Sequence, residues 1–376
     1  QSDLENGIVA GYNLGKIKFN AKLPLKKNEI IFSNIEGARG LSRYKGNVRL
    51  GLIEKPYQLK IDFNAPRATF SDLKEIIKPI VPINLYNQRE LQARFATSGI
   101  VNIDFRGRPT KLEIDVNGES LSYTGEYFDG FSSNIRMNAG RLNIRDIKLK
   151  RDSVEGRGSV LWDTDTNYLE YDFSMSGLSL KSFNIYRLLP ISLESLFDID
   201  IYGSGILNAD HSMRSSIVTR ESMILKNKVP NSRLDAYFAG NELTVQADLM
   251  DSMARLEAFI PFSGKKETQV RANLAATDIS PLVGLFSPTR MNEQSLNGRA
   301  FAQLQASFPL EKPENANIKV DVRDMQVSYK SKNFSISKQN TLVVRSGKFE
   351  NWNIATDTKS DFKINSSANG NLAGDF

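Results

Sequence analysis

Apolar and polar residues alternate one by one along most of this chain. Leu59, Ile61 and Phe63, for example, alternate with Lys60 and Asp62. Because successive strand side chains point to opposite faces, such a run predicts a β-strand with one apolar and one polar face. Parallel strands covered on both faces would instead read as continuous apolar runs. The same alternation recurs at residues 112–116, 171–175, 197–201, 243–249 and 318–322.

Turn-forming dipeptides separate these runs. They are Asn117-Gly118, Asp129-Gly130, Ala139-Gly140, Ala239-Gly240 and Ser346-Gly347. Short connections of this kind are typical of hairpins, so the pattern predicts an antiparallel meander. At about 13 residues for each strand and turn, the chain has room for about 25 strands.

Three segments break the two-residue period: residues 69–79, 179–190 and 278–288. Each opens with a capping type of residue, continues with apolar residues at helical spacing, and closes on a proline that stops a helix. We therefore predict three short helices, with Ser71 as the N-cap of the first and Asp278 as the N-cap of the third.

The three segments also reveal an internal repeat. Each follows a strand and precedes a glycine-bearing strand, as in Ser98-Gly-Ile-Val, Gly203-Ser-Gly-Ile-Leu and Leu296-Asn-Gly-Arg-Ala. Corresponding positions lie about 100 to 110 residues apart, which indicates about three and a half copies of one unit. Because no linker interrupts the pattern, we expect residues 1–376 to form one continuous, elongated, repetitive β domain.

A long sheet of this kind carries a continuous apolar strip, and contiguous exposed apolar surface marks a binding site. A second sheet could cover the strip, the sheet could close into a barrel, or it could curl into a trough that holds an apolar ligand. Recurring helices argue against a barrel, so we favour the trough, with the helices bracing its open side. The candidate lining residues are Ile61, Phe63, Leu142, Ile144, Tyr171, Phe173, Ile199, Ile201, Leu243 and Val245.

Ordinary core packing is the alternative for each of these residues. Strand parity fixes which side chains share a face, but it does not say what that face contacts.

Composition limits the class of protein. The 376 residues are 40% hydrophobic, and the mean hydropathy is −0.35. No window approaches the roughly 18 uninterrupted apolar residues of a membrane-spanning helix. The first residues lack the build of a signal peptide, and we expect the chain to be part of a longer protein. The absence of cysteine excludes disulfides, thiolate zinc sites and cysteine nucleophiles.

The net charge of +6 comes from one end of the chain. Residues 1–60 hold eleven Lys or Arg against five Asp or Glu. These cations alternate with apolar residues, so we interpret them as a solvated strand face. The alternative is a surface that meets anionic lipid headgroups. Aromatic or helical reading elements are missing, and we expect no nucleic-acid partner.

No constellation of residues predicts catalysis, a metal site or a cofactor. His211 is the only histidine, and the chain has no phosphate-binding glycine loop. The pairs Gly156-Arg-Gly158 and Gly203-Ser-Gly205 lie in predicted strands, where they indicate bulges or bends. Asp198 and Asp200 share a strand face opposite apolar neighbours, so we expect them to face water. The sequence therefore predicts a protein that is not an enzyme.

Three passages carry a resemblance to a known family. They are Ser98-Gly-Ile-Val-Asn-Ile-Asp-Phe-Arg-Gly, then Ala139-Gly-Arg-Leu-Asn-Ile, then Val154-Glu-Gly-Arg-Gly-Ser-Val-Leu-Trp. Their pattern of strands and glycines resembles that of the AsmA-like superfamily of bridge-like lipid transfer proteins, and within it most closely the TamB branch of the translocation and assembly module. The resemblance covers nearly the whole chain, but it is a pattern of strands and glycines without a signature motif.

The resemblance implies a β-taco, which is a U-shaped groove with an apolar interior. It implies that phospholipid acyl chains move along the groove between the inner and outer membranes of Gram-negative bacteria, across the periplasm. It also implies an inner-membrane anchor and an outer-membrane β-barrel partner, both engaged through parts not in this chain. The alternative is a β scaffold that assists outer-membrane protein assembly by strand pairing, without lipid transport.

Overall fold

The structure of the chain is a computed structural model. It describes residues 2–9, 12–24, 28–51, 58–72, 91–104, 109–184, 193–207, 209–224, 227–262, 266–279, 296–329, 332–336, 340–357, 360–361 and 365–372. The chain divides into two compact units, which are described separately. The first comprises Gln1–Ser176 and Gly203–Asn208, and the second comprises Gly177–Tyr202 and Ala209–Phe376.

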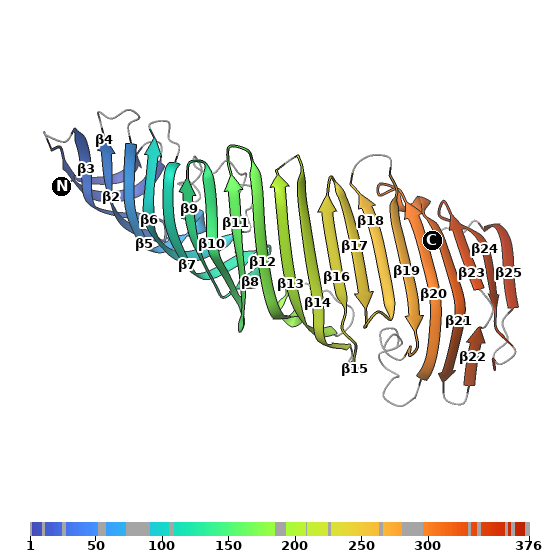
Figure 1. Ribbon diagram of the computed structural model, residues 1–376. Coiled ribbons are helices and arrows are strands. Elements are labelled where there is room, and N and C mark those ends of the chain that lie inside the picture. The colour runs from blue at the N-terminus through green and yellow to red at the C-terminus, as the bar shows by residue number, and fades with distance from the viewer. Residues whose placement is uncertain are drawn as a thin grey trace. The chain divides into compact units, whose positions relative to one another are not determined.

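The first unit is built from long strands that pair in sequence order (Figure 1). Its strands are β1 (Ser2–Val9), β2 (Tyr12–Lys22), β3 (Glu29–Arg39), β4 (Ser42–Gly51), β5 (Gln58–Thr69), β6 (Gln92–Asp104), β7 (Pro109–Tyr123), β8 (Glu126–Phe128), β9 (Gly130–Asn138), β10 (Arg141–Arg151), β11 (Val154–Asp163) and β12 (Tyr168–Ser179). The pairings from β1–β2 to β11–β12 are all antiparallel.

The second unit continues the same architecture. Its strands are β13 (Leu193–Ile206), β14 (His211–Ile224), β15 (Asn227–Lys228), β16 (Arg233–Ala239), β17 (Glu242–Leu249), β18 (Ala254–Pro261), β19 (Thr268–Ala276), β20 (Leu296–Phe308), β21 (Asn317–Tyr329), β22 (Lys332–Ile336), β23 (Asn340–Arg345), β24 (Lys348–Ala355) and β25 (Asn365–Leu372). In the described part of this unit, the 3₁₀ turns η2 (Leu180–Ser182) and η4 (Pro313–Asn315) lie between strands. In both units the sheet is antiparallel and does not close, which confirms the all-β prediction.

The predicted repeat appears as a recurring order of strands. β7, β14 and β21 are each followed by a short strand, and each then pairs with the next long strand, β9, β16 or β23. Each of these groups comes after a long connection, which leads into β6, β13 or β20. Those three strands begin at Gln92, Leu193 and Leu296, so the repeat has the expected length.

The first predicted helical segment begins at the end of β5. Residues 70–72 are helical, and the Asp72 backbone N–H donates to the Thr69 hydroxyl at 3.3 Å. Thr69 is therefore the N-cap, and the prediction of Ser71 is wrong because the helix starts one residue before it. The Asp72 carboxylate accepts hydrogen bonds from the Ser42 hydroxyl at 2.8 Å and from the Thr69 hydroxyl at 2.8 Å. Burial opposes ionisation of Asp72, but these hydrogen bonds prevail and hold its pKa below the ordinary value.

The other two predicted helices lie mostly outside the described residues. In the second segment, Leu180–Ser182 form a 3₁₀ turn, and residues 185–190 are outside. In the third, Asp278 and Ile279 are described, and the remainder of 278–288 is outside.

Two of the predicted hairpin turns occur where the sequence indicates, and two others do not. In Ala139-Gly140 the backbone φ angles are 47° and 78°, and in Ser346-Gly347 they are 48° and 74°. Positive φ at both central positions is the mark of a type I′ turn, so these two predictions are confirmed. The Asn117-Gly118 prediction is wrong, because both residues lie inside β7. The turn predicted at Ala239-Gly240 falls one residue later, because β16 extends through Ala239.

Candidate functional site

Cross-strand register gathers the apolar side chains of the first unit on one face. Residues directly opposite each other in antiparallel strands lie on the same face of the sheet. One row contains Val48, Ile61, Val101, Leu112, Met137, Leu142 and Trp162, and the adjacent row contains Gly46, Phe63, Gly99, Ile114, Ile135, Ile144, Val160 and Tyr171. Phe173 lies two residues beyond Tyr171, opposite Gly158. The structure thus brings together all six candidate residues of this unit.

The second unit repeats the arrangement. One row contains Ile217, Leu234, Ala247, Leu256, Ala272, Leu304, Val320 and Leu342, and the next contains Ala236, Val245, Ala258, Val270, Ala306, Ile318 and Val344. The candidate Leu243 lies opposite Phe238 and Ile260 on the same face. On β13, the candidates Ile199 and Ile201 share one face of the strand and alternate with Asp198 and Asp200.

This apolar face is only half-covered. All ten candidate residues are half-buried. A facing sheet would bury such side chains in a shared core. Among the described residues, no large side chain is less than 2% exposed, and no strand forms a second layer. A packed sandwich is therefore absent from the described part of each unit.

Small parts of the connecting segments rest on the face in the second unit. The Phe183 ring, just after the 3₁₀ turn, lies 5.6 Å from the Phe197 ring, measured between centroids. Ile279, which follows β19, is 6% exposed and packs against Ala276 and Ala300. Its backbone N–H donates to the carbonyl of Gly298 at 3.0 Å. Phe183 and Ile279 thus lie against the apolar face of the second unit.

Glycines let aromatic rings lie flat on the apolar face of the first unit, which includes Gly203 near the end of β13. The pairs are Gly37 with Tyr44, Gly118 with Phe131, Gly156 with Phe173, and Gly203 with Tyr171. A Cβ atom added at any of these glycines would lie 2.0–2.7 Å from the nearest ring atom, which is too close for a real contact. Each ring therefore occupies the place where a side chain would stand. Burial of the Tyr44 ring raises the pKa of its hydroxyl to about 12, against a smaller lowering by Arg39.

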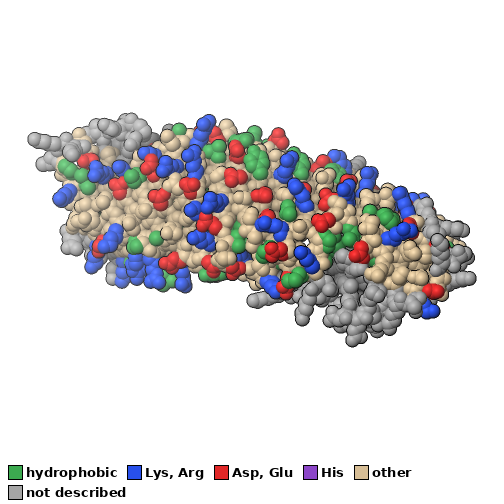
Figure 2. Space-filling model, turned by 60° about the horizontal axis from the view of Figure 1, so that its bottom comes forward, with side chains coloured by type: hydrophobic (Ala, Val, Ile, Leu, Met, Phe, Trp, Pro, Cys, Tyr) green, Lys and Arg blue, Asp and Glu red, His purple; other side chains and the backbone are tan. Residues whose placement is uncertain are grey.

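The opposite face is charged. Figure 2 shows basic and acidic side chains interspersed over a face on which hydrophobic side chains are few. Lys111 and Glu113, for example, form an ion pair at 2.9 Å. Each such pair between exposed side chains contributes little to stability. Together they keep this face of the sheet solvated.

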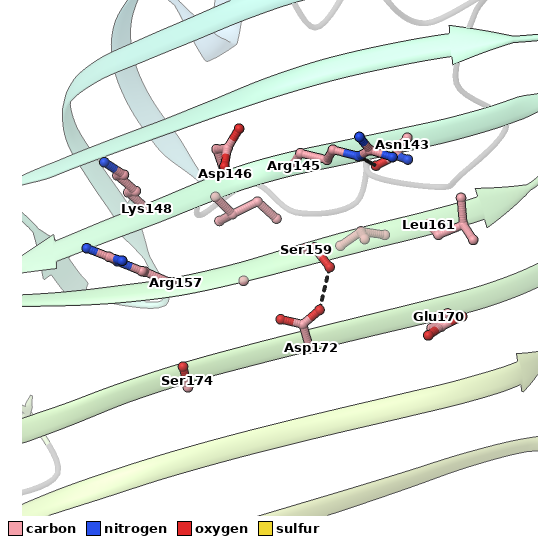
Figure 3. Close-up of a pocket in the computed structure, with 13 residues that line it drawn as sticks. Asn143, Arg145, Asp146, Lys148, Arg157, Ser159, Leu161, Glu170, Asp172 and Ser174 are labelled. Carbon is pink, nitrogen blue, oxygen red and sulfur yellow. Dashed lines mark hydrogen bonds between the residues drawn. The ribbon is translucent and has the colours of Figure 1, made fainter.

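A shallow depression lies on this polar face (Figure 3). It has a volume of about 550 Å³. It is lined by Asn143, Arg145, Asp146, Ile147, Lys148, Arg157, Gly158, Ser159, Val160, Leu161, Glu170, Asp172 and Ser174. A bulge at Asp146, where φ is 51°, shifts the register of β10 against β11 and opens the surface. The Ser159 hydroxyl bonds to Asp172 across the next pair of strands. None of the ten candidate residues lines this depression.

Asp198, which was singled out from the sequence, and Asp163 both have structural partners. Asp198 accepts the Gly177 backbone N–H at 2.8 Å and pairs with Arg220. Asp163 accepts the backbone N–H groups of Thr166 and Asp165 at 3.1 Å each. The Thr166 bond is the largest cause that holds the pKa of Asp163 below its ordinary value. These acids thus stabilise a strand junction and a turn.

The remaining chemistry is sparse. In the parts of the chain that are described, no three His, Asp or Glu side chains gather as a metal site. His211 opens β14 and is half-buried. No helix among the described residues is both long and apolar enough to span a bilayer.

The chain was compared with protein-family models, curated proteins and solved structures. No match was found in any of the three. The site is therefore interpreted from its own geometry and chemistry.

Proposed function

We propose that the apolar face is the lining of a groove for phospholipid acyl chains. The observation that carries this proposal is the half-burial of all ten candidate residues on a face with no second layer among the described strands. Removing a CH₂ group from water is worth about 0.8 kcal/mol, so an acyl chain laid on this face gains from every carbon that it buries.

Movement along the groove requires sites of similar affinity. The two rows in each unit are mainly aliphatic, and adjacent strands are about 4.8 Å apart. A hydrocarbon chain passing from strand to strand would exchange one aliphatic neighbour for another, so no position holds it much more tightly than the next. Charged headgroups would remain in water outside the apolar rows, because burying an unpaired charge is costly.

The cellular role that we propose is the one implied by the resemblance of the sequence to the AsmA-like superfamily. The chain is a segment of an AsmA-like, TamB-type bridge that conducts phospholipids between the inner and outer membranes of a Gram-negative periplasm and supports outer-membrane biogenesis. A β-barrel partner in the outer membrane and an anchor in the inner membrane would act through other parts of the protein.

Neighbouring residues of β12 provide a matched test. Phe173 belongs to the apolar face and Ser174 to the polar face. A carboxylate at Phe173 would lie unpaired among acyl chains, and we expect Phe173→Asp to lower bound phospholipid by about tenfold or more. Ser174→Asp places the same charge in water and should leave binding unchanged. Native mass spectrometry of the purified variants measures the bound lipid, and circular dichroism checks that both remain folded.

Two results would contradict the proposal. One is wild-type protein, purified from bacterial membranes, that carries no phospholipid. The other is a photo-reactive residue at Phe173 that crosslinks to outer-membrane protein strands and to no lipid, which would favour the scaffold alternative. The variant Ile199→Glu offers a second position if Phe173→Asp does not fold.

A further inference from the structure

Basic side chains gather on the polar face of β2, β4 and β5. Lys16, Lys22, Arg43, Arg49 and Arg67 are all exposed, and together they are called the basic surface. Arg43, Lys45 and Arg49 alternate along β4, so they project from the same face. Among the described residues, none of the five members of the basic surface has an ion-pair partner. The basic surface therefore carries positive charge that no acid among the described residues neutralises by an ion pair.

The register places cations directly against cations. Arg43 lies opposite Arg67, and Arg49 lies opposite Lys60. Like charges in directly opposite positions destabilise a sheet. Asp62 approaches Lys60 only to 4.0 Å, and no acid lies between Arg43 and Arg67 in the ladder. An anion bound from outside would relieve both repulsions at once.

Two exposed leucines lie at opposite ends of these strands, each close to a cation in the sequence. Leu41, in the turn between β3 and β4, is 63% exposed and lies between Arg39 and Arg43 in the sequence. Leu23 directly follows Lys22 and is 62% exposed. No other large hydrophobic side chain in the described part of the chain is as exposed as these two. Each leucine is therefore an apolar tip beside a positive charge.

We propose that the basic surface, with Leu23 and Leu41, docks on a bilayer of anionic phospholipid. Cations attract the headgroups, while each leucine enters the boundary between headgroups and acyl chains. A nucleic acid would also match the charge, but it gives an aliphatic tip nothing to enter, and the rows of the basic surface contain no aromatic side chain for base stacking. The docking surface rests on charge and exposure, so it stands whether or not the apolar face carries lipid.

Vesicle sedimentation with the full chain tests the docking surface. The probes are vesicles of phosphatidylcholine alone and of phosphatidylcholine with about one third phosphatidylglycerol. We expect binding only to the second kind. Each cation near an anionic surface strengthens binding by about fivefold, so the triple variant Lys22→Gln, Arg49→Gln, Arg67→Gln should bind about a hundredfold more weakly. This variant should fold well, because it removes one cation from each facing pair.

Three comparisons separate the proposal from a general effect of charge. A control variant, Lys148→Gln, Arg271→Gln, Lys348→Gln, removes the same charge from exposed positions elsewhere and should bind as the wild type does. Leu23→Ser with Leu41→Ser should weaken binding by about tenfold or more at unchanged charge. Raising the salt from about 0.1 M to about 1 M should abolish most of the binding, since screening shortens the range of the charges.

Equal loss in the two charge variants would overturn the proposal, and so would equal binding to neutral vesicles. The protein should bind a nucleic-acid duplex more weakly than anionic vesicles. If it binds the duplex as strongly, and the leucine variants bind the duplex equally well, the partner is a nucleic acid and not a bilayer. If the docking surface fails while Phe173→Asp still reduces bound lipid, the groove proposal survives alone. The reverse outcome leaves a docking surface without a groove.

Discussion

At the scale of single residues, glycines without a side chain shape the apolar face as much as the apolar side chains do. Strand alternation in the sequence was enough to place Ile61 and Phe63 on one face of their strand, because a period of two leaves no choice of side. It did not identify the glycines beneath aromatic rings. Gly118 was interpreted as part of a turn, whereas it lies within β7 under the Phe131 ring. That pairing depends on cross-strand register, which a local pattern does not contain.

The pair formed by Gly37 and Tyr44 has a spectroscopic readout. We predict that Gly37→Ala will displace the Tyr44 ring from the sheet and lower its pKa from about 12 towards the ordinary value near 10, because the hydroxyl regains water. A tyrosinate absorbance titration, with Tyr44→Phe to assign the signal, measures the shift.

The same pKa determines a dependence of stability on pH. The unfolded chain ionises Tyr44 near pH 10, before the folded protein does, so this tyrosine lowers the stability of the fold progressively as pH rises from about 10 to about 12. Wild-type protein should lose more stability over this interval than Tyr44→Phe. An unshifted pKa in Gly37→Ala would show that the ring does not depend on the glycine.

At the scale of elements, the strands could be predicted better than their connections. Alternation extends over many residues, whereas a turn depends on one or two φ angles. The shift of the predicted Ala239-Gly240 turn to Gly240-Asn241 illustrates the difference, because Asn241 accepts a φ of 63° and so competes for the turn position. Helix starts have a similar uncertainty: Thr69 and Ser71 are both good caps, and only the hydrogen bond from Asp72 distinguishes them.

The turn between β9 and β10 contains a correctable strain. Ala139 adopts a φ of 47°, which costs a residue with a Cβ atom about 1–2 kcal/mol. Asparagine tolerates this conformation, so Ala139→Asn should stabilise the protein by about 1 kcal/mol and raise Tm by about 1–2 °C. Ala139→Val should act in the opposite direction. Differential scanning calorimetry compares the three proteins, and a lower Tm for the asparagine variant would contradict the assigned turn type.

At the scale of the whole molecule, the repeat could be predicted from the sequence. Whether a second sheet covers the apolar face could not. A repeat of about one hundred residues was visible in the sequence, and the spacing of β6, β13 and β20 confirms it for the strands. The sequence left open whether a second sheet covers the apolar face. The half-burial of the candidate residues shows that no second sheet covers the face among the described residues of each unit, and periodicity in the sequence contains no information about such neighbours.

Because strand order recurs, the length of the protein is adjustable in whole steps. Removing residues 168–268 would place Val270, Ala272 and Leu274 where Leu169, Tyr171 and Phe173 now stand, opposite the same positions of β11. We expect this shortened protein to fold with an unbroken sheet, as judged by circular dichroism and a cooperative melt.

A cut only one residue shorter, of residues 168–267, would turn Gln269, Arg271 and Asn273 to the apolar side, and the chain should then misfold or aggregate. Equal folding of the two deletions would disprove this parity requirement. If the requirement holds, a gene could lengthen or shorten the molecule by duplicating or losing one unit, provided that the joint preserves the alternation between odd and even positions. The number of strands in the protein would then depend on how many copies of the repeat unit its gene contains.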